Sequence, residues 1–125
     1  MSLDLAKVAA LAAMEKTDEP ITVLDVQNIL AITDYFVISS GKNSRQVKAI
    51  VDEVNKKVKL AGSSPPRQVE GLGELEWVLL DYGTFVVHVF STEARSLYSL
   101  ERLWEDAERV DVASKEVPVA TSAVR

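Results

Sequence analysis

The sequence predicts an α/β fold, in which helices pack on a mixed β-sheet of about four to five strands. The first observation is residues 35–40 (YFVISS), which are apolar up to Ser39 and typical of a strand buried on both faces. The second is the stretch that follows, where apolar residues recur at helical spacing: Val47, Ile50, Val51, Val54 and Val58. The third is a pair of apolar segments, 76–82 and 84–90, which flank Gly83 as in a β-hairpin. A hairpin is antiparallel, whereas a strand–helix–strand passage can cross over, so the sheet should be mixed.

The elements before the buried strand follow from local patterns. A helix should begin near the first residue, where Asp4 complements the helix dipole, and should end near Lys16. Residues 17–20 (TDEP) break this helix, and the alternation in residues 21–27 (ITVLDVQ) predicts a strand. Residues 31–34 then connect to the buried strand.

The central helix has start and stop signals. Asn43 followed by Gln46 resembles a capping box, and Gly62 is placed to end the helix. Residues 62–68 (GSSPPRQ) form a loop by composition, because adjacent prolines are incompatible with a continuing helix.

A last helix should begin at Thr92, with four apolar residues on one face: Leu97, Leu100, Trp104 and Ala107. After Val110 the sequence has small residues, a proline and no helical stripe. We therefore expect one domain over residues 1–110 and a flexible C-terminal tail over residues 111–125.

Composition excludes several kinds of site. The 125-residue chain has no cysteine, which excludes disulfides, thiolate nucleophiles and zinc sites with sulfur ligands. Its net charge is −5 and its pI is near 4.9. Since the chain is acidic and shows no basic stripe, we expect little direct contact with nucleic acid. We also expect no signal peptide, no membrane span and a cytoplasmic location.

The junction SGKNSRQ, residues 40–46, presents a choice between a ligand site and a turn. A glycine between a strand and a helix can expose backbone N–H groups to a phosphate, and Lys42 would add a positive charge. The Walker and dinucleotide patterns both need further glycines, which this stretch lacks. We favour a turn with a helix cap over a phosphate site.

Groups that could perform catalysis are few. His88 is the only histidine, and we favour a partly buried, hydrogen-bonded histidine over a catalytic base. Metal-dependent nucleotidyl transfer needs converging carboxylates, commonly two residues apart on one strand. Three aspartates lie in or beside strands without forming such a pair: Asp25, Asp34 and Asp81. We expect no metal and no cofactor, and place Asp34 and Asp81 at turns.

Aromatic residues in the second half of the chain suit a partner surface. Trp77 starts a strand after an irregular loop, with Asp81 on the same face, and Trp and Tyr are common interface anchors. Trp104, on its helical stripe, fits the core better. Four carboxylates on the last helix could complement a basic partner: Glu101, Glu105, Asp106 and Glu108.

Three segments carry a family resemblance: TDYFVISSGKNSRQVKAI from Thr33, LLDYGTFVVHVF from Leu79 and RSLYSLERLW from Arg95. In their residues and in their order along the chain, these segments resemble the ribosomal silencing factor (Iojap-like) family, over roughly residues 3–110. The resemblance implies a nucleotidyltransferase-like topology without the catalytic carboxylates. It also implies a factor without enzymatic activity that binds the large ribosomal subunit through ribosomal protein fourteen. Such a factor blocks joining of the small subunit, represses translation, and forms a homodimer when free.

The resemblance also suggests roles for individual residues. Four of them would shape the turn and start the helix: Asp34, Gly41, Ser44 and Gln46. The predicted partner surface comprises Trp77, Asp81, Tyr82, His88, Arg95, Tyr98, Leu100, Glu101 and Trp104. The alternative is an enzyme, a nucleotidyltransferase-like domain that would hold a nucleotide and magnesium with Gly41, Ser44 and Asp81.

Overall fold

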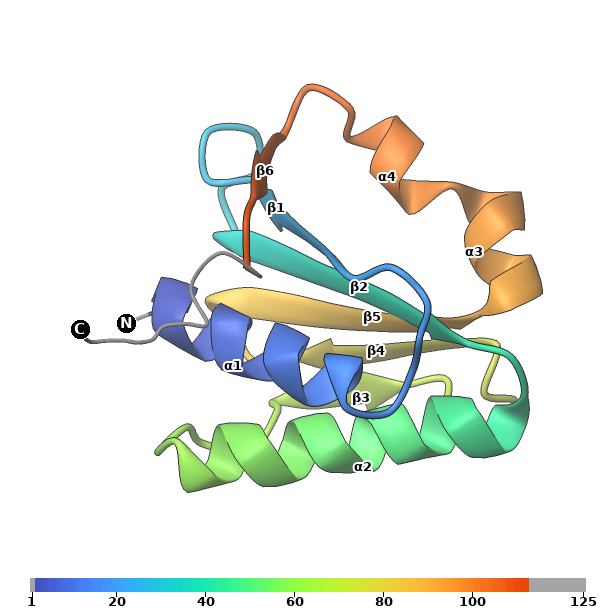
Figure 1. Cartoon of the computed structure of the whole chain (residues 1–125). Coiled ribbons are helices and arrows are strands. Elements are labelled where there is room, and N and C mark those ends of the chain that lie inside the picture. Colours follow the sequence, from blue (N-terminus) through green and yellow to red (C-terminus); the bar gives the residue numbers. More distant parts are fainter. Residues whose placement is uncertain (1, 113–125) are drawn as a thin grey trace.

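The protein is organised around one six-stranded sheet. A computed structural model describes residues 2–112, and its strands hydrogen-bond in the order β3-β4-β5-β2-β1-β6 (Figure 1). The strands are β1 (Thr22–Asp25), β2 (Tyr35–Gly41), β3 (Gln68–Glu70), β4 (Trp77–Asp81), β5 (Phe85–Ser91) and β6 (Glu108–Val110). β2 and β5 pair in parallel, and the other four strand pairs in this sheet are antiparallel. The mixed α/β sheet is confirmed, but the predicted four to five strands were too few.

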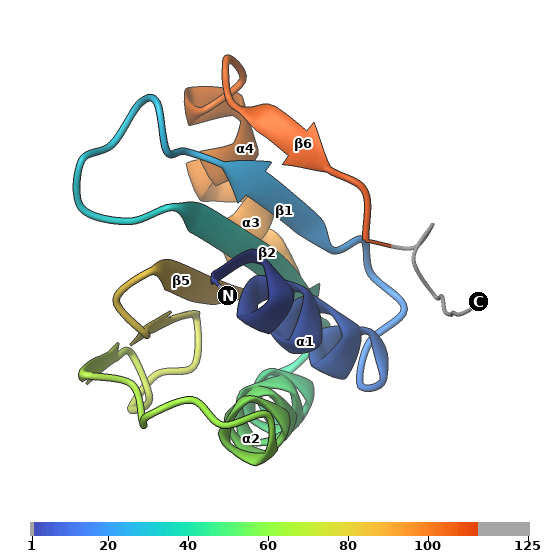
Figure 2. The ribbon, with the colours of Figure 1, turned by 90° about the vertical axis from the view of Figure 1, so that its left-hand side faces the viewer.

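Helices cover both faces of the sheet, to different extents. The long helices α1 (Ser2–Met14) and α2 (Ser44–Leu60) pack on one face. The short helices α3 (Thr92–Tyr98) and α4 (Leu100–Leu103) lie on the other face, as Figure 2 shows. The first face is therefore closed by two full helices, whereas the second is covered only in part.

The two faces have separate apolar cores. Strand β2 is buried at all seven positions because it lies in the middle of the sheet, between β5 and β1. Its Val37 and the neighbouring Val87 pack with α1 and α2, whereas Phe36 and Ile38 pack with Phe90 under α3 and α4. A strand covered on both sides favours apolar residues, which explains the run from Tyr35 to Ile38, and the small residues Ser39, Ser40 and Gly41 complete the buried strand.

Helix α2 has the ends that the sequence predicts, with one difference. The Asn43 side chain accepts a hydrogen bond from the backbone N–H of Gln46 (2.8 Å). The Gln46 side chain accepts from the backbone N–H of Lys42 instead of Asn43, so the capping box is only half formed. At the other end Gly62 has φ +101°, and the N–H groups of Gly62 and Ser63 bond back to the last helical turn.

The region after Thr92 differs from the single helix that we expected. Ser99 adopts a left-handed conformation (φ 49°), which divides the segment into α3 and α4. Leu97 is consequently 77% exposed instead of lying on a shared apolar face with Leu100 and Trp104. The left-handed residue changes the direction of the chain between α3 and α4. Leu97 on α3 therefore does not continue the apolar face that includes Leu100 on α4.

The two outermost strands were not expected from the sequence. β3 and β6 have three residues each, and each pairs with only one neighbour, β4 and β1 respectively. Gly71, directly after β3, has φ +91°, and a Cβ atom there would lie 2.0 Å from the carbonyl oxygen of Trp77. Only glycine allows this close approach, so Gly71 fixes the chain where it enters β4.

The described chain ends soon after β6. Val112 is buried and packs in the core beneath α1, while residues 113–125, most of the predicted tail, lie outside the described part. Among residues 2–112, no helix has the length and apolar character needed to cross a membrane.

Candidate functional site

The structure distributes the predicted partner surface over two sides of the sheet. In β4, side chains alternate between faces, so Trp77 and Asp81 share the side of α3 and α4. Tyr82 packs on the opposite side, where its ring stacks on Phe85 (centroids 4.8 Å apart) and its hydroxyl bonds to the Asn55 side chain. Burial raises the pKa of Tyr82 to about 12, in keeping with a phenol held in the fold. Tyr82 is thus separated from the other eight residues.

An aromatic cluster of Trp77, Phe90 and Tyr98 lies on the α3 and α4 side and reaches solvent in part. The Trp77 ring lies 4.9 Å from that of Phe90 and 4.8 Å from that of Tyr98. Tyr98 is 50% exposed and Trp77 is half-buried, while Phe90 closes the cluster from below. Amphipathic rings that are held in place and still reach solvent are suited to anchoring a protein partner.

Two leucines extend the exposed apolar surface of the same helices. Leu97 on α3 is 77% exposed and Leu103 on α4 is 73% exposed. Sequence reasoning placed Leu97 in the core and did not single out Leu103. The missing signal was the break at Ser99, because a left-handed non-glycine residue leaves little trace in a sequence. We refer to Trp77, Leu97, Tyr98 and Leu103 as the docking face.

His88 lies beneath the docking face and holds Trp77 in place. The Trp77 indole N–H donates to His88 Nδ1 (3.1 Å), and the Phe36 ring meets the imidazole edge-on at 4.8 Å. His88 is only 4% exposed, so it cannot itself form much of a contact surface. Its Nε2 is buried and has no hydrogen-bond partner among the described residues. The predicted hydrogen-bonded, buried histidine is therefore confirmed at one ring nitrogen.

His88 makes stability depend on pH. Burial lowers its pKa to about 4, whereas an exposed histidine in the unfolded chain has a pKa near the ordinary 6.5. The unfolded state therefore binds a proton first as the pH falls, and the free energy of unfolding should fall by up to about 1.4 kcal/mol per pH unit between pH 6.5 and about 4. Urea denaturation at pH 7, 6 and 5 should show this slope in the wild type and a smaller one in His88→Phe. Equal slopes would mean that native His88 binds a proton as readily as the unfolded chain.

Arg95 and Glu101 form an internal ion pair. Arg95 Nη2 lies 2.6 Å from Glu101 Oε2, and Arg95 Nε donates to Glu101 Oε1 (3.2 Å). Arg95 Nη1 also donates to Ser40 Oγ (2.9 Å) and to the Pro20 carbonyl, and Thr22 donates to Glu101 (2.7 Å). Arg95 and Glu101 are 13% and 21% exposed, so most of their hydrogen-bonding capacity is used within the fold.

The ion pair fastens α3 and α4 to the sheet. Burial alone would raise the pKa of Glu101, but hydrogen bonds from Arg95 and Thr22 outweigh it, so the pKa lies below the usual 4.5. The pair lines a polar cleft of about 680 Å³ together with Glu19 and Thr92. Glu19 accepts from Ser40 and Thr92, which lowers its pKa as well. The hydrogen bonds of Arg95, Glu101 and Glu19 thus hold α3 and α4, which carry most of the docking face, against the sheet.

The other predicted partner residues also have structural contacts. Leu100, the first residue of α4, is buried, and Trp104 is half-buried, with its ring 5.9 Å from that of Phe36. Asp81 accepts from the backbone N–H of Gly83 (2.8 Å) at the hairpin, which is the turn position that we expected. Of the nine residues, only Tyr98 is exposed, and the two tryptophans, Trp77 and Trp104, are half-buried.

The strand-to-helix junction is a packed turn. A Cβ atom on Gly41 would lie 3.0 Å from the backbone nitrogen of Val47, so a glycine lets α2 start close to β2. Gln46 joins the Lys42 N–H to the Lys16 carbonyl, and Ser44 is the exposed first residue of α2.

Asp34 shapes the other end of β2. Its backbone carbonyl accepts from Val26 (2.9 Å) and its N–H donates to Thr84 (2.9 Å). These bonds tie the entry of the strand to β1 and to the β4–β5 hairpin.

The structure does not assemble the alternative nucleotide site. Gly41 pairs with Ser91 and Asp81 pairs with Val86, so the two lie five residues apart along β5, about 17 Å. Within residues 2–112, no group of three or more histidine or carboxylate side chains is placed to hold a metal ion.

Comparisons with known proteins agree on one family. A model of the family described as ribosomal silencing factor during starvation matches residues 1–124, a longer range than the motif resemblance. The ribosomal silencing factor RsfS of Bacillus subtilis is 41% identical over 108 residues, covering 86% of this chain and 91% of the relative. A mouse protein, mitochondrial assembly of ribosomal large subunit protein 1, is 31% identical over 121 residues, covering 92% of this chain and 53% of the relative.

A solved structure supports the same assignment. A crystal structure of a protein from Chromobacterium violaceum superposes with a TM-score of 0.79 and 32% sequence identity, covering 84% of this chain and 87% of that one. The fold, the three motifs and the family match coincide, and the chain belongs to the ribosomal silencing factor family.

Proposed function

We propose that this protein binds the large ribosomal subunit through ribosomal protein fourteen and sterically blocks joining of the small subunit, which represses translation. The observation that carries the proposal is the docking face, where Trp77 and Tyr98 are held by the fold and still reach solvent. The names of the Bacillus subtilis and mouse relatives support a ribosomal partner.

The mechanism requires binding and volume only. A protein seated where the two subunits meet excludes the second subunit by occupying its space, with no bond made or broken. The aromatic cluster would supply the anchor, because buried aromatic residues contribute most of the binding free energy at many interfaces. In the free protein we propose a homodimer, since an exposed apolar surface favours self-association.

Co-sedimentation with separated subunits tests the proposal. The purified protein should pellet with large subunits and not with small ones, and should lower the yield of joined ribosomes in proportion to the fraction bound. Binding to the large subunit without a loss of joining would contradict the steric mechanism. Absence of binding to either subunit would contradict the proposed function as a whole.

A further inference from the structure

The charge of this acidic protein is unevenly distributed. Residues 42–59 carry six basic and two acidic side chains, a net charge of +4, whereas the whole chain carries −5. The rest of the chain therefore carries −9. The basic charge is concentrated on and just before α2, which contradicts our expectation that the chain has no basic stripe.

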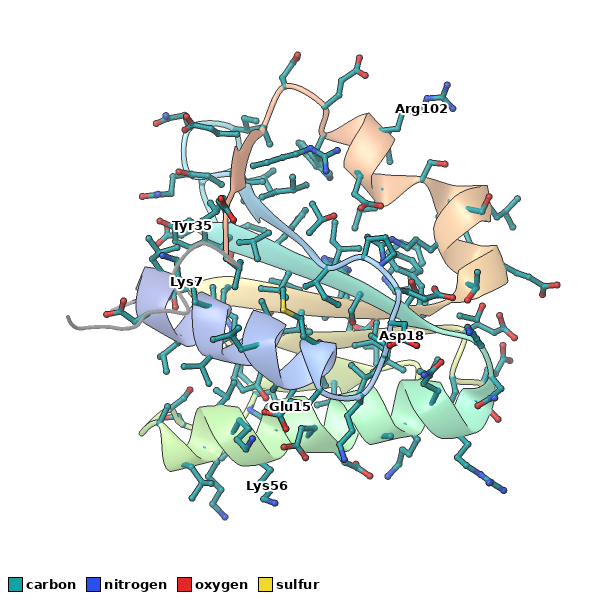
Figure 3. The ribbon with its side chains drawn as sticks, viewed as in Figure 1. Lys7, Glu15, Asp18, Tyr35, Lys56 and Arg102 are labelled. Carbon is teal, nitrogen blue, oxygen red and sulfur yellow. The ribbon has the colours of Figure 1, made fainter. Side chains whose placement is uncertain are left out.

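Several of these cations are available to a partner. Lys48 pairs with Asp52 (3.0 Å), and Lys57 pairs with Glu15 and Glu53 (2.9 Å each). Four others are exposed and make no side-chain hydrogen bond or ion pair within the described part of the chain: Lys42, Arg45, Lys56 and Lys59. Figure 3 shows Lys56 pointing away from the sheet, at the opposite end of the view from Arg102 on α4.

The exposed charges follow one side of the helix. Successive steps of three, four, four and three residues connect Arg45, Lys48, Asp52, Lys56 and Lys59. At 1.5 Å per residue this row is about 21 Å long. Beside its first turns is a depression of about 400 Å³, lined by Arg45, Lys48, Asp52 and Leu75 among others. Asp52 lies in the middle of this row and pairs with Lys48, so the unpaired cations lie at its two ends, Arg45 at one end and Lys56 and Lys59 at the other. This spacing suits separate phosphates of one extended anion.

We infer that this basic face of α2, formed by Lys42, Arg45, Lys48, Lys56 and Lys59, contacts phosphates of ribosomal RNA when the protein is docked on the large subunit. The inference rests on the proposed function. α2 packs on the sheet face opposite α3 and α4, so the basic face and the docking face can contact different components at once. The docking face is apolar and aromatic and suits a protein, whereas exposed cations, four of the five unpaired, suit a phosphate backbone.

The acidic remainder of the chain fits the same arrangement. A net charge of −9 outside residues 42–59 repels RNA from the other surfaces and orients the protein as it approaches a polyanionic particle. Contact with RNA would then be confined to one face, and it would weaken as the salt concentration rises.

The test compares two doubly substituted proteins. Arg45→Gln/Lys56→Gln removes two charges from the basic face, and Lys7→Gln/Arg109→Gln removes two charges from α1 and β6. Affinity for purified large subunits and for isolated ribosomal protein fourteen is measured at several potassium chloride concentrations. The slope of log affinity against log salt should become shallower by about 1.5 for the first variant on whole subunits, with an affinity loss on the order of tenfold at low salt. The control variant should match the wild type, and both variants should bind the isolated protein normally.

Each other outcome has a distinct meaning. A wild-type slope for Arg45→Gln/Lys56→Gln on large subunits would overturn the RNA contact and leave the proposed function intact. An equal loss on the isolated ribosomal protein would also overturn it, because α2 would then face a protein. If wild-type protein bound no large subunits, the proposed function and the RNA contact would both fail.

Discussion

Trp77→Ala should weaken binding to the large ribosomal subunit by about 2 kcal/mol or more, a factor of about 30 in affinity. The indole is half-buried against Phe90 and Tyr98, and its N–H is fixed by His88, so little conformational entropy is lost when a partner covers it. Truncation removes the largest ring of the docking face and leaves a gap that an ordered partner cannot fill. Co-sedimentation with a titration of large subunits gives the affinity.

The control for Trp77→Ala must separate lost contact from lost stability. Val54 is a fully buried residue of α2 on the opposite face of the sheet, so Val54→Ala should lower the free energy of unfolding by about 1 to 2 kcal/mol without touching the docking face. Its affinity for large subunits should equal that of the wild type. If Val54→Ala lost affinity as Trp77→Ala does, the loss would reflect stability alone, and Trp77 would be a core residue.

Arg95→Met should lower the free energy of unfolding by about 2 to 3 kcal/mol, because it leaves the Glu101 carboxylate partly buried without its cation. The value is below that of a fully buried pair since both side chains retain some contact with water. The substitution also removes the bonds to Ser40 and Pro20 that fasten α3 to the sheet. Affinity for large subunits should therefore fall as well, although Arg95 does not form the docking face. Urea denaturation and co-sedimentation measure the two effects.

A second substitution tests this explanation. Arg95→Met/Glu101→Leu removes both charges, so it should recover much of the stability that the single variant loses. Additive losses in the double variant would contradict an internal ion pair.

Because the pKa of Glu101 is lowered in the native state, the stability from its ionised form is present above the usual 4.5 and is lost as the pH falls further. The Glu101→Gln variant should lack that part of the acid sensitivity.

The central elements could be predicted because each follows from a local pattern that burial reinforces. The unbroken apolar run of β2, the valine spacing of α2 and the turn at Gly83 all agree with the structure. The strands β3 and β6 could not be predicted, because three residues with mostly exposed side chains carry no period of their own. They form strands only because β4 and β1 offer unpaired backbone groups beside them.

The candidate site was predicted by residue type more accurately than by role. Trp77 and Tyr98 were assigned to a partner surface. Tyr98 is exposed and Trp77 is half-buried, which is consistent with that hypothesis. Arg95 and Glu101 were assigned there too, yet they bind each other across the break at Ser99. A separation of six residues matches no helical pairing, so their contact arises from the way α3 and α4 fold back onto the sheet.

The family, the mixed sheet and its two core elements follow from the sequence alone, because motifs and hydrophobic period are properties of the order of residues in the chain. Which polar and aromatic groups reach solvent depends instead on how the elements pack. Packing buries His88 behind Trp77 and pairs Arg95 with Glu101. It leaves Lys56 and Lys59 exposed along α2. The sequence shows which side chains are charged or aromatic. Whether such a side chain is available to a partner depends on contacts between residues far apart in the chain.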